Sequence, residues 1–227
     1  MQAPVSIAGI LAPDTAYTRK ANDLVARVHN REMLNHVHRS WWFADFLGRK
    51  RGLTYDREVV YLASVMHDLG LAEPFHADKR FEVDGADAAR STLRADGFDE
   101  ERVQTVWDAI AFHSSIGIAE YKAPEIALVH MGSHLDVLGF YYDEVTPALI
   151  DDTLQLYPRV GFAAAFQAAL AEVIRKKPLL AAGTGLVDIG HRHVPGFHLP
   201  NGCDLLENTV FESRHGHARS GSDTAGV

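Results

Sequence analysis

Two carboxylates of this sequence lie in segments that are apolar enough to be buried. Asp68 follows His67 at the end of VVYLASVM, which is apolar on every side when wound as a helix. Asp136 lies between Leu135 and Val137 in the largely apolar segment EIALVHMGSHLDVLG. A buried carboxylate without a partner costs several kcal/mol, so each needs a cation, strong hydrogen-bond donors or a metal ion. For the His67-Asp68 pair alone, the alternative is a helix end at the surface, with His67 near the negative end of the dipole.

A histidine on an earlier helical segment can join these carboxylates. At about 100° per residue, His36 shares a helix face with residues typical of a core: Met33, Val37, Ser40, Phe43, Ala44 and Leu47. His38 shares its face with residues typical of a boundary with water: Leu34, Trp42, Asp45 and Arg49. We therefore expect His36 to point inward and His38 outward. Three helices would then each direct a ligand residue inward, and this coincidence favours a metal site over three separate core residues.

Further titratable residues are candidates for moving protons or contacting a substrate. His113 follows the apolar stretch VWDAIAF and has a side chain suited to proton transfer, with a plain helix-ending histidine as the alternative. Glu82 is a weaker candidate for the same role. Arg39 and Asp84 are candidates for contacting a substrate. A structural salt bridge is the alternative for Arg39, and a favourable place in the first helical turn is the alternative for both acids.

His130 and His134 are four residues apart and could form a metal-binding helix face. They point away from Asp136 on a helical wheel, and the segment lacks the glutamate of an H-E-x-x-H metalloprotease motif. We interpret them as ordinary, partly exposed histidines.

Helical periodicity dominates the elements that must position these residues. It predicts helices over residues 14–30 (with Asp14 as the cap), 32–50, 56–70, 83–95, 99–113, 124–141, 146–156 and 159–176. The fold class is therefore all-α, with one helical domain over residues 1–182. Residues 183–212 are rich in Gly, His and Pro and are expected to form irregular cover, and residues 213–227 a disordered tail.

Composition narrows the range of partners. The 227 residues suit one domain, and 47% of them are hydrophobic. A net charge of −8 repels phosphate backbones, so no nucleic-acid partner is expected. The single cysteine, the absence of a recognisable signal peptide and the lack of a long apolar run favour a cytoplasmic protein without a membrane span. A small-molecule substrate is expected, and the oligomeric state, a homo-oligomer included, stays open.

The order of these motifs resembles the HD-domain superfamily of metal-dependent phosphohydrolases and related enzymes. The likeness is closest to its cyanamide hydratase-like branch, and it covers roughly residues 30–140. It rests on NHVHR (35–39), HDLGL (67–71), RFEVDGA (80–86), VWDAIAFHSS (106–115) and the segment from Gly132 to Asp136 that leads into VLG. The resemblance implies an HD-type helical bundle with its metal ligands at His36, His67, Asp68 and Asp136.

The sequence departs from the HD pattern at one position, and this departure bears on how many metal ions we expect. HD enzymes with two metals have further histidines after the His-Asp pair. His113 matches one of them, but Phe81 occupies the place where the other is expected, and His76 lies in a connecting loop. We therefore expect one divalent ion. The resemblance favours zinc, while iron and manganese stay open.

The resemblance implies an enzyme, a metal-dependent hydratase or hydrolase. A bound ion would lower the pKa of water to about 7, and the water would add to a small nitrogen-containing electrophile such as cyanamide or a nitrile. We expect a compact, mostly apolar pocket. The alternative is a nucleotide or phosphate-ester phosphohydrolase, for which Arg39, Lys79 and Arg80 are the visible basic residues. An iron-dependent oxygenase would need the two-metal pattern, and an inactive metal-stabilised binding module is a further alternative.

Overall fold

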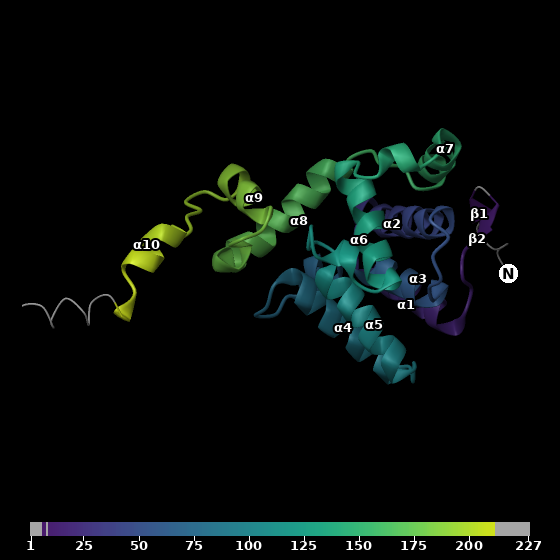
Figure 1. The fold of residues 1–227 in the computed structure, drawn as a ribbon, viewed down its shortest axis with the longest axis horizontal. Coiled ribbons are helices and arrows are strands. Elements are labelled where there is room, and N and C mark those ends of the chain that lie inside the picture. The colour runs from purple at the N-terminus through teal and green to yellow at the C-terminus, as the bar shows by residue number, and fades with distance from the viewer. Residues whose placement is uncertain (1–5, 8, 212–227) are drawn as a thin grey trace, which may run out of the picture.

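The computed structural model describes residues 6–7 and 9–211, and nearly all of their regular structure is helical (Figure 1). This confirms the all-α fold class. The α-helices are α1 (Ala16–Val28), α2 (Arg31–Lys50), α3 (Arg57–Met66), α4 (Phe81–Ala95), α5 (Glu100–Phe112), α6 (Pro124–Leu138), α7 (Pro147–Leu156), α8 (Phe162–Lys176), α9 (Leu186–His193) and α10 (Gly202–Glu207). Short 3-10 helices connect them: η1 (Leu69–Leu71), η2 (Glu73–Phe75), η3 (Ala119–Tyr121), η4 (Tyr142–Glu144) and η5 (Pro178–Ala181). Strands β1 (Ser6–Ile7) and β2 (Ile10–Leu11) form a small antiparallel hairpin.

Side-chain caps determine where several helices begin. Helix α1 starts after Thr15, which forms a capping box with Thr18, and not after Asp14 as predicted. Asp14 instead pairs with Arg19 in the first turn of the helix. The Asp56 side chain accepts hydrogen bonds from two backbone N–H groups at the start of α3. That helix ends at Met66, earlier than predicted, and η1 follows it.

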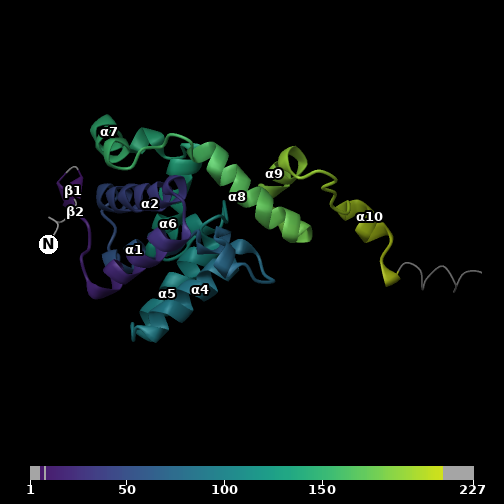
Figure 2. The same cartoon turned by 180° about the vertical axis from the view of Figure 1, so that it is seen from behind.

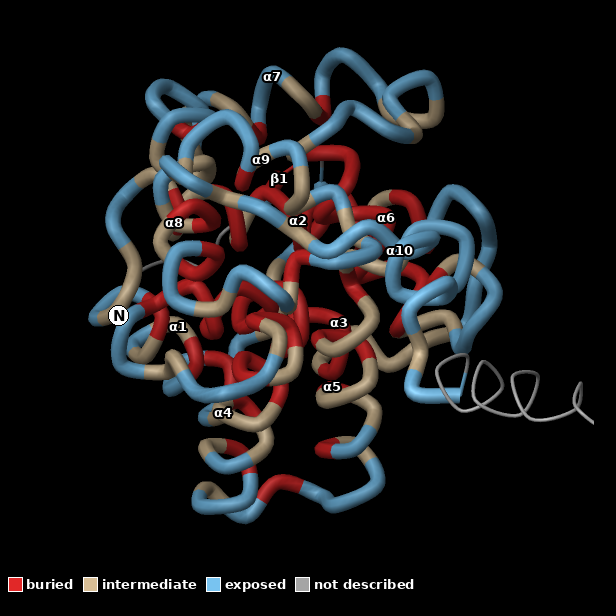
Figure 3. The backbone as a smooth tube through the Cα atoms, turned by 90° about the vertical axis from the view of Figure 1, so that its left-hand side faces the viewer, coloured by how far each residue is buried: buried red, intermediate tan, exposed pale blue. Residues whose placement is uncertain are grey.

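Helices α2, α3 and α6 form the centre of the molecule. Helix α3 is buried along nearly its whole length, as its apolar sequence predicts, and packs against α2, α5 and α6. Helices α2 and α6 share the most extensive contact, and they approach closely at Gly132, where a Cβ atom would lie 2.2 Å from the Ser40 carbonyl oxygen. Figure 3 shows the buried backbone concentrated in these central helices. The tight crossing brings the face of α2 that carries His36 against the face of α6 that carries Asp136.

The Gly132→Ala variant should therefore be strongly destabilised. The added methyl group would overlap the Ser40 carbonyl and the Ala44 side chain, which lies 2.8 Å away, and overpacking of this kind typically costs about 1–3 kcal/mol. Chemical denaturation measures the free energy of unfolding. Gly202→Ala is the matched control, because nothing lies within 4 Å of a Cβ there. Equal stability of the two variants would contradict the close packing of α2 on α6.

The C-terminal helices extend beyond the central bundle (Figures 1 and 2). Helix α8 packs on α2 and η1, and α9 packs on α8. A second apolar cluster joins these segments and contains Met33, Leu71, Phe81, Phe162, Leu170 and Val173. The prediction of irregular cover over 183–212 is wrong for α9, where Leu186 and Ile189 pack against this cluster, and for α10, which the Asn201 side chain caps. The predicted disorder of 213–227 lies outside the described residues.

None of the described helices has both the length and the apolar character that a membrane crossing requires.

Candidate metal centre

Three buried side chains direct ligand atoms at one point. His36 Nε2 lies 3.1 Å from His67 Nε2 and 3.3 Å from Asp68 Oδ2, and His67 Nε2 lies 3.4 Å from the same oxygen. Each of these side chains is only 1% exposed. His36 comes from α2, whereas His67 and Asp68 lie where α3 ends and η1 begins. Because these ligand atoms lie so close to one another, the group can hold a metal ion.

The Asp68 carboxylate is the strongest indication of a cation. Both of its oxygens are buried and neither forms a hydrogen bond of good geometry among the described residues, and their nearest polar neighbours are imidazole nitrogens, with His36 Nε2 3.3 Å from Oδ2 and His113 Nε2 3.8 Å from Oδ1. Burial opposes the charge, but the imidazoles of His67, His36 and His113 outweigh that effect and hold the pKa of this carboxyl below its usual range. An ionised, buried carboxylate without hydrogen bonds is costly unless a cation balances it. A divalent ion held by Asp68, His36 and His67 would satisfy that requirement, and without an ion a protonated His36 does so.

The remaining ring nitrogens of the two histidines are held by acceptors, and this orients the rings. His67 Nδ1 donates to the Ser64 carbonyl at 2.6 Å, and His36 Nδ1 donates to Asp136 Oδ2 at 2.6 Å. Such partners set the tautomer and leave the Nε2 lone pair for a metal ion. Burial lowers the pKa of His67 to about 3, so this imidazole is neutral, as a ligand must be.

His36 differs from His67 because carboxylates lie on two sides of it. Burial opposes its charged form, but Asp136 and Asp68 outweigh that effect and raise the pKa of the imidazole. Without a metal ion, a proton on His36 balances the two carboxylates. Metal binding at Nε2 must displace that proton.

Asp136 was predicted to be a metal ligand, but it contacts the far side of the His36 ring and does not belong to the group of three. Its oxygens accept hydrogen bonds from Arg39 Nε at 2.6 Å, from Arg39 Nη2 at 2.8 Å and from His36 Nδ1. Burial opposes the charge, yet the bonds from His36 and Arg39 lower the pKa of Asp136 to about 2. In this geometry Asp136 orients the His36 ring and is not part of the group of ligand atoms formed by His36, His67 and Asp68.

The predicted substrate contacts of Arg39 and Asp84 are corrected by the structure, because neither side chain lines the cavity described below. Arg39 is fully buried, and its remaining nitrogen donates to the carbonyls of Tyr157 and Pro158. Asp84 accepts from two backbone N–H groups of the preceding loop and from Lys177. Both residues make structural salt bridges.

His38 turns away from the metal group and lies at the boundary with water, as predicted. Its half-buried ring stacks on Tyr157 with the ring centres 5.1 Å apart. Burial lowers the pKa of His38 to about 4.

The His36→Ala variant should lose its metal ion, whereas His38→Ala should keep close to one metal ion per chain. Elemental analysis after dialysis measures both, and equal loss in the two variants would contradict the assignment of His36.

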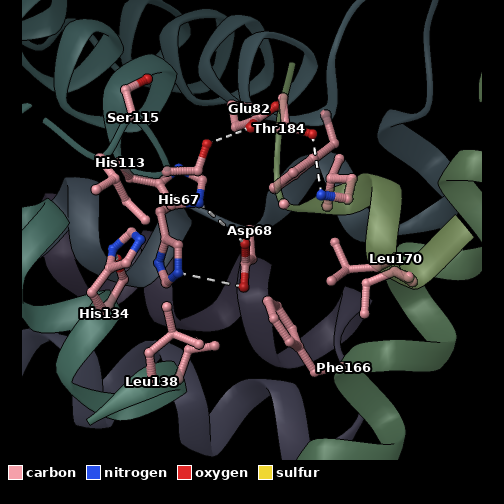
Figure 4. A pocket seen from close by; sticks show the side chains of 18 of the residues that line it. His67, Asp68, Glu82, His113, Ser115, His134, Leu138, Phe166, Leu170 and Thr184 are labelled. Carbon is pink, nitrogen blue, oxygen red and sulfur yellow. Dashed lines mark hydrogen bonds and ion pairs between the residues drawn. The ribbon is translucent and has the colours of Figure 1, made fainter. Parts of the chain in front are cut away.

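His113 and Glu82 both line the cavity beside the metal group (Figure 4). His113 Nε2 lies 3.8 Å from Asp68 Oδ1, while its Nδ1 donates to the Ile110 carbonyl. Glu82 accepts from Arg80 and from the Ser114 hydroxyl. Burial opposes its charge, but Arg80 in particular outweighs that effect and lowers the pKa of the carboxyl. Glu82 is therefore an anion at neutral pH, able to accept a proton or hydrogen bond.

The interpretation of His130 and His134 as partly exposed is wrong, because both are buried. His130 Nδ1 donates to the His113 carbonyl at 2.7 Å, and its Nε2 lies 3.1 Å from Glu120 of η3. His134 lines the cavity, and burial lowers its pKa to about 4. The nearly all-apolar sequence of α6 was the available signal, since such a helix is buried on every side.

The metal group opens into a cavity of about 800 Å³. Helix α8 contributes Phe162, Phe166 and Leu170 to its wall, and α9 contributes Leu186 and Ile189. The cavity is larger than the compact pocket predicted for a small nitrile, because α8 and α9 form one wall of a wide cleft that is partly open to solvent. Sequence reasoning missed this wall, since its residues look like ordinary helix-packing positions.

Comparisons with known proteins leave the resemblance to the HD-domain superfamily untested. No protein-family model matches this chain, and no curated protein matches it significantly. The arguments for its function therefore come from the site itself.

Proposed function

We propose that this chain is a metal-dependent hydratase or hydrolase that adds activated water to the electrophilic carbon of a nitrile-like substrate. The observation that carries the proposal is the Asp68 carboxylate, which is buried, forms no hydrogen bond of good geometry among the described residues, and lies 3.3 and 3.4 Å from the Nε2 atoms of His36 and His67. Such a group at the floor of a cavity is typical of a catalytic metal site, in which protein ligands leave a coordination position open.

The bound ion, with zinc as our first choice and iron or manganese as alternatives, would supply water of lowered pKa. His36, His67 and Asp68 hold that ion. Asp136 keeps the His36 ring in place, and Arg39 keeps Asp136 ionised through two hydrogen bonds. An outer hydrogen bond of this kind raises the basicity of the ligating imidazole.

Addition of water to a carbon–nitrogen multiple bond requires a proton at the nitrogen. His113 is our candidate for delivering it: because its Nδ1–H is engaged by a backbone carbonyl, its Nε2, the nitrogen nearer Asp68, would take the proton that the attacking water loses and pass it to the substrate nitrogen. Glu82 would accept a proton or a hydrogen bond from the attacking water, since its carboxylate lines the cavity. The Ser114 hydroxyl that bonds Glu82 keeps this carboxylate in position.

Phosphate-ester hydrolysis is the second candidate, because Arg80 and Arg159 also line the cavity. Both are already engaged. Arg80 Nε and Nη2 donate to Glu82, and Arg159 Nε and Nη2 donate to the Asp136 carbonyl. These bonds occupy the bidentate Nε–Nη2 edge of each guanidinium, the edge that best matches a phosphate, so we place this reaction second.

Metal analysis combined with a substrate screen tests the proposal. We expect close to one divalent ion per chain, because one ligand group is found among the described residues. The zinc-loaded protein should turn over nitriles and be weak on nucleoside monophosphates. Efficient nucleotide hydrolysis without nitrile turnover would support phosphate-ester hydrolysis instead. Tight metal binding without any turnover would favour the non-enzymatic binding module.

A further inference from the structure

We infer that the substrate of this site carries an uncharged hydrophobic body, a ring system or an alkyl chain, which lies along a wall formed by α8 and α9. The inference rests on the proposed function only for the reactive end of the molecule, which would face the metal group. The hydrophobic body is argued from the cavity itself.

The volume of the cavity excludes a very small molecule as its full occupant. About 800 Å³ equals the volume of some 25 water molecules at about 30 Å³ each. A ligand with three heavy atoms, such as cyanamide, would leave most of this space filled with water against apolar walls. Cavities of this size typically bind ligands of drug-like dimensions.

The walls of the cavity are apolar on two opposite sides. Helices α8 and α9 and their connection supply one side, which includes Phe166, Leu186 and Val187. Ile116, Ile118 and Leu138 line the other side, and each is more than half exposed. Large apolar side chains that are exposed within a cavity gain free energy when a hydrophobic ligand covers them.

The distribution of charge indicates that this body is uncharged. Among the described residues that line the cavity, those from α8, α9 and residues 183–185 include no acidic or basic side chain. Gln167 and Thr184 are the polar residues of that wall, and Thr184 already donates to the Ala181 carbonyl. The ionisable groups lie instead around the metal group and on the facing wall, where the reactive end of the substrate would be.

Ala163 allows a direct test, because it is exposed, lies in the first turn of α8 and lines the cavity. The Ala163→Trp variant fills part of the cavity with a bulky ring. Ala164→Trp is the matched control, since Ala164 is an exposed neighbour on the same helix that does not line the cavity. A second pair of variants removes apolar wall area instead of adding bulk. Phe166→Ala removes a ring that lines the cavity, and Leu179→Ala is its control, because Leu179 is exposed and does not line the cavity.

Binding is measured on metal-free protein with N-phenyl-1-naphthylamine, a neutral fluorescent probe, and by its displacement with straight-chain nitriles of increasing length. Affinity should rise about fourfold for each added methylene until the cavity is filled. Ala163→Trp should weaken binding of the long nitriles about tenfold or more, and Ala164→Trp should change it less than about twofold. Phe166→Ala should weaken it more than Leu179→Ala does. Circular dichroism establishes that each variant is folded.

The outcomes separate this inference from the proposed function. Length-dependent binding that Ala163→Trp abolishes supports the hydrophobic body, even if the zinc-loaded protein hydrates no nitrile. Affinities that do not change with chain length, or equal effects of the Ala163 and Ala164 variants, overturn it, even if short nitriles are turned over.

Discussion

Replacing Asp68 with asparagine is expected to abolish both metal binding and activity. The substitution keeps the shape of the side chain but removes the charge of the one ligand carboxylate in the group formed with His36 and His67. The neutral amide cannot balance a divalent ion in a buried site, where a cation without a counter-charge is costly. Activity should fall by more than the roughly 10- to 100-fold loss that is typical for removal of an outer hydrogen-bond partner.

Thermal unfolding with and without zinc measures this effect separately from folding. At free zinc about 100 times the dissociation constant, the wild-type protein should gain about 2.7 kcal/mol of stability, and Asp68→Asn should gain almost none. Asp45→Asn is the matched control. Asp45 is equally buried, but it accepts hydrogen bonds from Arg57, Arg49 and Tyr55, so its loss should lower stability and leave the zinc response intact. Zinc stabilisation of Asp68→Asn equal to that of the wild type would refute the assignment.

Replacing Asp136 with alanine should give a different pattern, in which metal binding weakens but persists. We expect metal affinity to fall by about 10- to 100-fold, the usual effect of losing an outer partner of a ligating histidine. Stability should fall by about 3–5 kcal/mol, because Arg39 would remain buried without the carboxylate that accepts two of its hydrogen bonds. Titration with zinc and chemical denaturation measure the two quantities.

A second substitution separates the two roles of Asp136. In the Asp136→Ala background, Arg39→Met removes the unpaired buried charge and should restore part of the lost stability. It cannot replace the hydrogen bond to His36 Nδ1, so metal affinity should stay low. Complete loss of zinc binding in Asp136→Ala, in protein that is folded, would show that Asp136 is a direct ligand, as the sequence pattern predicted.

The sequence by itself determined the helical fold and the burial of Asp68, the carboxylate of the candidate metal group. Apolar periodicity located the helices from α1 to α8, and the apolar run before His67 identified Asp68 as a buried carboxylate. The face of α2 also distinguished His36 from His38. These inferences succeeded because they depend on local properties, namely the repeat of one helix and the desolvation of one carboxylate.

Only the tertiary structure decided which residues meet, and at what distance. His36 and Asp136 are 100 positions apart in the chain, and the order of the motifs could not show whether that carboxylate faces the metal group or the ring behind it. A shift of a few ångströms makes this difference, and the crossing of α2 and α6 at Gly132 sets it. The burial of His130 beside Glu120, and the cavity enclosed by α8 and α9, likewise depend on neighbours from distant segments. A helical repeat reports which side of a helix is apolar, but the depth of burial and the partner on that side are properties of the packed chain.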